Sequence, residues 1–427
     1  MAREMKDSGI EWIGEIPKAW KVAPLKRFAK IQTGNTPSKA YEALFYADEG
    51  ILWIKPDNLG TGSPITYTAD YLTPEGRNAA RVMPPNTVYV CCIGSLGKVG
   101  YSLVEGCCNQ QINALIYNDR MYWKYGYYLT LAQESRYLLY GNGNVLQIIN
   151  VTNQGNIECV VPSLSEQKDI SNFLDGMCVE IDSVLEKTRA SIEEYKKLKQ
   201  AVIAQAVTKG IRGDREMKDS GIEWNDKIPA EWDSMNPKAL FRQRKDKAFE
   251  GEKQLTASQQ HGIMFQSDYM ELTGTKVVTV EKDFDILKHV EAGDFVISMR
   301  SFQGGLEYSE LSGSISSAYV MLVPNLELVY PRFYRWLLKS EVYIRALQST
   351  SNMVRDGQAM RYSNFSQVRL YTVPMEEQEE IAKYLDEKCK IIDNLIAKKE
   401  QYLSEIENYK KSLIFEYVTG KREVPQE

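Results

Sequence analysis

The chain carries the same stretch of sequence twice. Residues 3–12 read REMKDSGIEW, and residues 215–224 repeat these ten letters without change. Three more identities follow at the same shift of 212 positions, namely Ile16 with Ile228, Pro17 with Pro229 and Trp20 with Trp232. A period of half the chain is far longer than the roughly 20–50 residues of a solenoid repeat. We therefore expect two copies of one structural unit, related by a pseudo-twofold axis.

Each copy ends in a long helical pattern, whose apolar residues step alternately by four and three positions. The pattern runs from about residue 165 to 208 and again from about residue 376 to 419. The predicted seam contains Ile170, Leu174, Ile181, Val184, Tyr195 and Leu198 in the first helix, and Ile381, Leu385, Ile392, Leu395, Tyr402, Ile406 and Tyr409 in the second. This spacing keeps one stripe toward a partner helix and is typical of a coiled coil. Two such helices with matching registers most simply pair with each other.

A longer region, less similar between the copies, separates leader and helix. In the first copy, short apolar runs at 51–54, 87–93 and 112–116 predict strands, and the aromatic-rich stretch 122–139 predicts a helix. In the second copy, a shift of 207 places Phe295 over Val88 and Tyr308 over Tyr101. We predict an α+β protein, with two mixed α/β domains that share a frame, carry non-equivalent surfaces and are joined by the two helices.

Composition and charge are those of an ordinary globular protein. The 427 residues suffice for two or more domains, and a formal net charge of −5 gives no support to a generally basic nucleic-acid binder. No apolar run reaches the roughly 18 residues that span a membrane, and the N-terminus has no apolar signal core. Seven cysteines, an odd number, fit a reducing cytosol. We expect a cytoplasmic protein without membrane contact.

Residues that usually carry catalysis or bind metals are scarce. The two histidines, His261 and His289, are too few for a multi-histidine metal site and argue against a histidine triad. Adjacent cysteines at 91–92 and 107–108 point to opposite faces of a strand, so we interpret them as small buried hydrophobes. The glycine-rich turn 94–98 lacks the spacing of a phosphate loop. We predict no catalytic residue, no metal site and no cofactor in this chain.

Polar side chains suited to DNA cluster at the predicted turns, since Arg and Lys suit guanine and phosphate while Asn and Gln suit adenine. The candidates in the first central region are Asn35, Lys39, Lys55, Asn58, Ser95, Lys98, Asn109, Gln110, Gln111 and Asn113. Those in the second are Arg242, Arg244, Lys245, Lys247, Arg300, Ser301 and Gln303. Polar turn residues are also ordinary solvated loop residues, so both interpretations stay open for each one.

Several motifs together resemble the specificity subunit of a type I restriction–modification system. They are GIEWIGEIP at 9–17 with its copy at 221–229, WIKPDNL at 53–59, Pro162 followed by Glu166-Gln167, Pro374 followed by Glu377-Gln378, and the stretch 409–421. The resemblance covers essentially the full chain. It is weakest in the second central region, where we find no equivalent of the stretch 53–59.

The resemblance implies an arrangement of domains and a function. Residues 1–162 and 211–374 would each form a leader with a target-recognition domain, residues 163–210 and 375–420 two antiparallel coiled-coil helices, and residues 421–427 a C-terminal tail. Each target-recognition domain would read one half of a split double-stranded DNA site, and the helices would set the spacer. They would also dock two modification subunits that hold S-adenosylmethionine and methylate adenine. Restriction subunits would add ATP- and magnesium-dependent translocation and cleavage, so this chain would be a non-catalytic subunit.

Two other classes of function are compatible with parts of the sequence. A coiled-coil scaffold with two adaptor domains would show the same heptads, but no sequence-dependent DNA binding in the presence of its partners. A stand-alone nuclease or methyltransferase would need motifs that this sequence lacks, and activity of the purified chain alone would be required to support it.

Overall fold

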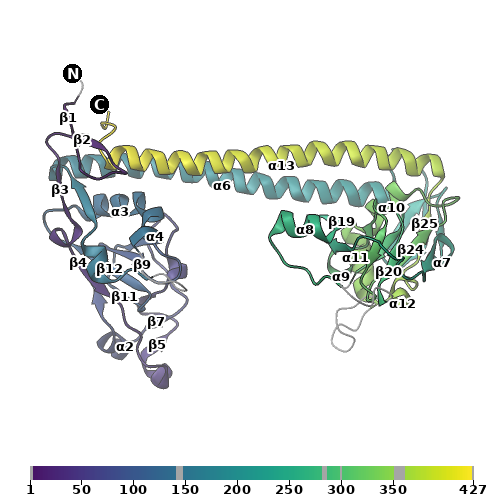
Figure 1. The fold of residues 1–427 in the computed structure, drawn as a ribbon, viewed down its shortest axis with the longest axis horizontal. Helices are drawn as coiled ribbons and strands as arrows, with labels where there is room; N and C mark the ends of the chain where they lie inside the picture. Colours follow the sequence, from purple (N-terminus) through teal and green to yellow (C-terminus); the bar gives the residue numbers. More distant parts are fainter. Residues whose placement is uncertain (1–2, 141–147, 281–285, 299–300, 351–360, 426–427) are drawn as a thin grey trace. The chain divides into compact units, whose positions relative to one another are not determined.

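The computed structural model describes residues 3–140, 148–280, 286–298, 301–350 and 361–425. The chain divides into two compact units (Figure 1), Met1–Arg189 with Gln401–Glu427, and Ala190–Glu400. Both units combine helices and strands, which confirms the predicted class. Each long helix begins in one unit and ends in the other.

The first unit is built around an antiparallel sheet of four strands in the order β10-β9-β12-β4. These strands are β4 (Ala29–Thr33), β9 (Thr87–Cys91), β10 (Val99–Ser102) and β12 (Ile112–Tyr117). Helix α3 (Trp123–Ala132) packs on one face of the sheet (Figure 1). Every residue of β9 is buried, because both faces of the sheet are covered, and this explains its continuous apolar sequence.

A smaller sheet covers the other face, with five short strands in the order β5-β7-β6-β11-β8. They are β5 (Tyr46–Ala47), β6 (Ile51–Ile54), β7 (Tyr71–Leu72), β8 (Val82–Met83) and β11 (Gly106–Cys108). Tyr89 and Cys91 point into the core shared by the two sheets, whereas Val88 and Val90 face the α3 side. Four short helices complete this part of the unit: α1 (Glu42–Phe45), α2 (Pro74–Ala79), α4 (Tyr137–Tyr140) and α5 (Val151–Gly155).

The second unit repeats the four-stranded sheet in the equivalent order β22-β21-β24-β17. Its strands are β17 (Phe241–Arg244), β21 (Phe295–Ile297), β22 (Glu307–Tyr308) and β24 (Val320–Pro324). Phe295 pairs with Tyr308 as Val88 pairs with Tyr101, so the predicted shift of 207 holds at the level of strand register. Helix α10 (Pro331–Leu338) packs where α3 packs in the first unit.

The two units differ where the first has its five-stranded sheet. The described residues of the second unit form two separate strand pairs there, β18 (Leu255–Ser258) with β19 (Gly262–Phe265) and β20 (Lys288–Val290) with β23 (Gly313–Ile315). Its remaining short helices are α7 (Pro237–Leu240), α8 (Gln266–Thr273), α9 (Ser301–Gly304), α11 (Glu341–Ser349) and α12 (Tyr362–Phe365). The four-stranded sheet is thus common to both units, whereas the five-stranded sheet of the first unit is replaced by two strand pairs in the second.

The leaders form equivalent strand pairs in the two units. The first contains β1 (Met5–Asp7) with β2 (Glu15–Pro17), and β3 (Lys21–Pro24) with β13 (Glu158–Val161). The second contains β14 (Met217–Ile222) with β15 (Asn225–Pro229), and β16 (Asp233–Met235) with β25 (Leu370–Thr372). Each leader thereby joins the strand that directly precedes a long helix.

One glutamate in the first turn of each long helix binds the leader of its own unit. In the second unit, Trp232 Nε1 donates to Glu377 at 3.0 Å, and Arg215 forms an ion pair with the same carboxylate. In the first unit, Glu166 makes the same two contacts with Trp20 and Arg3. Both tryptophans are buried, so each leader caps its own domain.

The long helices are α6 (Leu164–Lys209) and α13 (Met375–Val418), and they run antiparallel. In the first unit Lys410 Nζ lies 2.6 Å from a carboxylate oxygen of Asp182, and in the second Lys199 Nζ lies 2.7 Å from one of Asp393. Residues early in one helix therefore meet residues late in the other, as the resemblance implies. Within the described ranges, no helix is both long enough and apolar enough to cross a membrane.

The burial of the two helices agrees with part of the predicted seam and not with the rest. The predicted residues Ile170, Leu174, Ile181, Ile381, Leu385 and Ile392 are buried, and Tyr195 and Ile406 are half-buried. The predicted residues Val184, Leu198, Leu395, Tyr402 and Tyr409 are exposed, and the residue after each is more buried, namely Leu185, Lys199, Ile396, Leu403 and Lys410. Apolar neighbours such as Leu395 and Ile396 fit either phase of the repeat, and the second member of each pair faces inward.

We expect Glu377→Ala to destabilise the second unit more than Glu166→Ala destabilises the first. The Glu377 side chain is 1% exposed, so its loss leaves a largely buried guanidinium and an indole N–H without their partner, at a cost of about 3 kcal/mol. The Glu166 side chain is 24% exposed, and its loss costs about 1 kcal/mol. Urea unfolding followed by tryptophan fluorescence measures both, and equal losses would contradict this explanation.

Candidate nucleic-acid interface

The candidates of the first unit lie after β4, after β6, after β9, and in or beside the turn between β11 and β12. Lys39, Ser95 and Gln110 are exposed. The Gln110 side-chain oxygen accepts a hydrogen bond from the Thr36 hydroxyl, which leaves its amide N–H groups without a partner in the described part of the chain. These three side chains are available to a ligand.

Several other candidates of the first unit use their side chains to hold the turns together. The Asn35 side chain donates to Ala79 O at 3.0 Å and accepts from Arg81 N at 2.7 Å. The Asn58 side chain accepts from Lys55 N at 2.8 Å, and Lys98 donates to Pro56 O at 3.1 Å. The Asn109 side chain donates to that of Gln111 at 2.9 Å. Such residues shape the surface, and each has at least one side-chain polar atom engaged within the protein.

The assignment of Asn113 to the DNA surface is wrong. Asn113 lies within β12 and is 1% exposed. Its side chain accepts from Thr33 at 2.7 Å and donates to Gln154 at 2.7 Å. Alternate residues of a strand face opposite sides, and this position faces the core.

A cavity of about 290 Å³ opens between the loop after β4 and the smaller sheet. Its lining residues are Thr36, Lys39, Glu42, Tyr46, Trp53, Lys55, Asp70 and Asn109. Lys55 forms an ion pair with Asp70, so its charge is compensated locally. Lys39 has no ion-pair partner among the described residues. Of the two candidate lysines on this rim, Lys39 is therefore the one suited to a phosphate or a base.

In the second unit the candidates divide in the same way. Arg242, Lys245 and Gln303 are exposed, as is Lys247. Ser301 is fully buried at the start of α9, where its hydroxyl accepts from Ser298 N at 2.8 Å, so its assignment to the DNA surface is wrong. Arg300 lies outside the described residues.

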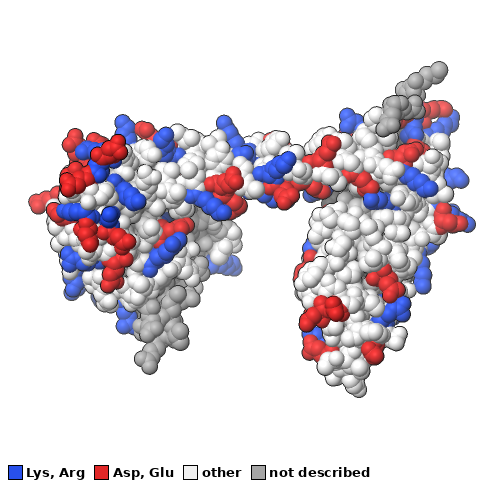
Figure 2. Space-filling model, turned by 180° about the vertical axis from the view of Figure 1, so that it is seen from behind, with Lys and Arg blue, Asp and Glu red and all other residues white. Residues whose placement is uncertain are grey.

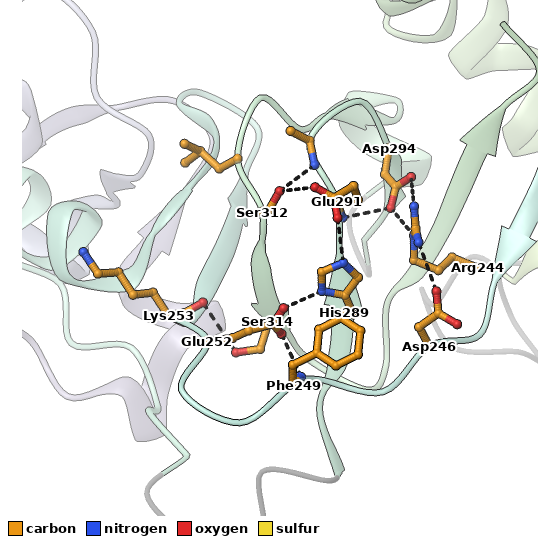
Figure 3. Close-up of polar contacts among 12 residues, drawn as sticks. Arg244, Asp246, Phe249, Glu252, Lys253, His289, Glu291, Asp294, Ser312 and Ser314 are labelled. Atoms are coloured by element: carbon orange, nitrogen blue, oxygen red, sulfur yellow. Dashed lines mark hydrogen bonds and ion pairs between the residues drawn. The ribbon is translucent and has the colours of Figure 1, made fainter.

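Arg244 belongs to a charged network that ties the loop after β17 to the neighbouring strands (Figure 3). Its guanidinium donates to both carboxylate oxygens of Asp294, at 2.6 and 3.1 Å, and to Asp246 at 3.0 Å. The Asp294 side chain is 2% exposed. Arg244 is therefore an ion-pair residue whose charge is compensated within the protein, and a DNA contact by this residue stays a prediction.

The same network contains a buried histidine that the sequence did not single out as part of a site. His289 Nδ1 lies 2.5 Å from Glu252 Oε1, and His289 Nε2 lies 3.2 Å from Glu291 Oε2. The Ser312 hydroxyl bonds to Glu291 at 2.5 Å, and this bond, together with that to His289, lowers the pKa of Glu291. The dense run of charges at 242–253 was the available signal.

Charge on the visible face of the molecule is mixed. Figure 2 shows Lys and Arg interspersed with Asp and Glu, with no large patch of one sign. This agrees with the formal net charge of −5. On this face, contact with a polyanion would depend on single cations and not on a broad basic patch.

The cysteines and the acidic residues that the structure describes form no metal-binding cluster. All seven cysteines are buried. Burial raises the pKa of Cys92 to about 12 and that of Cys107 to about 11. Across the described ranges, no group of His, Cys, Asp and Glu side chains is arranged to hold a metal ion.

We expect none of the seven thiols to react quickly with Ellman's reagent in the folded protein. A thiol with a pKa near 11 is about one part in a thousand thiolate at pH 8, and the thiolate is the nucleophile. In guanidinium chloride all seven should react. Fast release of one or more equivalents from the native chain would show that a reactive cysteine is accessible.

Known proteins match both the sequence and the fold. Residues 17–194 match the family described as the type I restriction modification DNA specificity domain. The HindI specificity subunit of Haemophilus influenzae is 31% identical over 189 residues, covering 43% of this chain and 39% of that protein. The putative MjaX specificity subunit of Methanocaldococcus jannaschii is 25% identical over 279 residues, covering 64% and 61%. The matches thus span between two fifths and three fifths of these relatives.

Two solved structures share the fold over nearly the full chain. One, solved in work on the complex assembly and conformational transition of the type I R-M system, has a TM-score of 0.69 at 13% identity and covers 95% of this chain and 99% of that one. The other, the HsdS subunit from Thermoanaerobacter tengcongensis, has a TM-score of 0.50 at 14% identity and covers 95% and 98%. Residues 17–194 thus belong to the family of type I restriction modification DNA specificity domains, and the chain as a whole is similar in sequence and fold to type I specificity subunits.

Proposed function

We propose that this chain recognises a split DNA sequence for a type I restriction–modification complex, with one half read by each unit. The observation that carries the proposal is the duplicated four-stranded sheet, which has one strand order in both units but different surrounding loops. A shared frame with diverged loops suits two half-sites of different sequence. Direct readout in the major groove distinguishes all four base pairs and would come from loop side chains.

The antiparallel helices would set the distance between the two half-sites. They are 46 and 44 residues long and each reaches from one unit into the other. A helix rises about 1.5 Å per residue, so adding or removing heptads in both helices would change the unread spacer and leave the half-sites unchanged.

The catalytic work would belong to partner subunits in the cytoplasm. Two modification subunits would dock on the helices and nearby frame, bind S-adenosylmethionine and methylate adenine. Restriction subunits would supply ATP- and magnesium-dependent translocation and cleavage. The chain itself would then be non-catalytic and bind no cofactor. Exposed apolar residues on the helices, such as Val179 and Ile391, support a role of the helices in docking.

The decisive experiment is methylome sequencing of a host that expresses the modification subunit with or without this chain. We expect a chain-dependent split motif with methyladenine in each half. Absence of chain-dependent methylation, with the modification subunit shown to be expressed and bound, would contradict the proposal and favour the coiled-coil scaffold.

Lys39→Ala should reduce the salt dependence of DNA binding more than Lys55→Ala. Both variants remove one positive charge, but only the Lys55 charge is already paired, with Asp70. If Lys39 contacts a phosphate, the slope of log K against log salt falls by about 0.9 for that variant. Titrations of the complex with its modification subunits at several salt concentrations measure the slope. A larger change for Lys55→Ala would reverse the roles assigned to the two lysines.

A further inference from the structure

Phe249 is an exposed aromatic side chain that the protein holds in place. It is 59% exposed, and no other Phe, Tyr or Trp among the described residues of the second unit is exposed. Its backbone N–H donates to Glu252 Oε2 at 3.1 Å, and its ring lies beside the imidazole of His289 with centroids 4.6 Å apart (Figure 3). A single exposed apolar residue is ordinary on a protein surface. One whose backbone and ring are both fixed is suited to a defined contact.

The residues beneath Phe249 fix the loop 245–253 to the sheet. Glu252 binds the Phe249 backbone with one carboxylate oxygen and His289 with the other. The His289 backbone N–H donates to Asp246 O at 3.0 Å, which holds the start of the loop. His289 is 4% exposed and lies in β20, which pairs with β23, so the anchor is a strand of the domain. Side chains supported in this way keep their geometry.

The loop occupies the same place in the fold as a candidate surface of the first unit. It follows β17, the edge strand that corresponds to β4 in the first sheet. The segment after β4 carries the exposed residues Lys39 and Tyr41, and the segment after β17 carries the exposed residues Lys245 and Phe249. In both units, then, the segment after the edge strand presents a cation and an aromatic ring to solvent.

We infer that Phe249 is a specificity-determining residue of the second unit, and that its ring contacts the 5-methyl group of a thymine in the major groove. Glu252 and His289 are positioning residues for that ring. This inference rests on the proposed function. The thymine methyl is the apolar feature that base edges offer in the major groove, and Phe is among the side chains that contact it. The neighbouring Lys245 is exposed and suits a backbone phosphate.

The test measures binding of the complex, with its modification subunits, to its own methylome-defined site. Each thymine of the half-site read by the second unit is replaced in turn by uracil, which differs only in lacking the methyl group. Adenine methylation in that half guarantees at least one such thymine. We expect one replacement to weaken binding by the unaltered complex about fourfold, the value for one buried methyl group. For Phe249→Ala the same replacement should have no effect, and thymine replacement in the other half-site should weaken binding equally for both proteins.

The positioning role is tested with a matched pair of variants on the same loop. Glu252 contacts Phe249 and His289, whereas Glu250 is exposed and has no partner in the described part of the chain. Glu252→Ala and His289→Gln should abolish the preference for thymine over uracil, and Glu250→Ala should keep it. A purely structural role would lower the affinity for both DNAs and leave their ratio unchanged, which would overturn the positioning role.

The outcomes separate this inference from the proposed function. A wild-type complex without a chain-dependent motif defeats the proposed function. If the wild-type complex prefers thymine over uracil and the Phe249→Ala complex keeps that preference, only the inference is defeated. A strong loss of binding by Phe249→Ala, combined with equal affinity of the unaltered complex for thymine and uracil DNA and with a kinked DNA, would identify the ring as a wedge between base steps and also overturn the methyl contact.

Discussion

The contact on which each half of the molecule depends is that between a leader and the first turn of a long helix. Glu377 accepts from the indole of Trp232 and pairs with Arg215, and its carboxylate lies at the positive end of the α13 dipole. One side chain therefore joins the leader to the helix. The first unit repeats this contact around Glu166, so the duplicated leaders make equivalent contacts with equivalent carboxylates.

The frame of the fold was predictable because the repeat is visible at the level of single residues. The shift of 207 between Val88 and Phe295 matches the strand register of the two sheets, since both positions are constrained by the same buried neighbours. The phase of the coiled coil was not predictable to the residue. Leu395 and Ile396 are equally apolar, and only the position of the partner helix decides that Ile396 is the less exposed of the two.

The candidate site was predictable as a region and only partly as a set of residues. Asn113 and Gln110 are both amides next to one turn, yet one is in the core and the other is exposed, because the strand begins between them. The residue type and position of Arg244 suggest a contact with a base, but its guanidinium donates to Asp294, which is fifty positions away in the sequence. Phe249 was overlooked because an apolar residue in a loop carries no polar signal. The feature that sets Phe249 apart is its contacts with Glu252 and His289. The contact with His289 cannot be predicted from the sequence, because the two residues are forty positions apart.

The division of the chain also orders its synthesis. The second unit is one continuous segment, Ala190–Glu400, whereas the core of the first unit includes Leu413, Tyr417 and Val418 from the end of α13. Those residues leave the ribosome after every residue of the second unit. The unit whose first part is translated earlier therefore completes its core later, and it does so by closing a loop that contains the whole second unit, Ala190–Glu400. A nascent chain that stops short of α13's last turns has made all of the second unit and left the first without part of its interior.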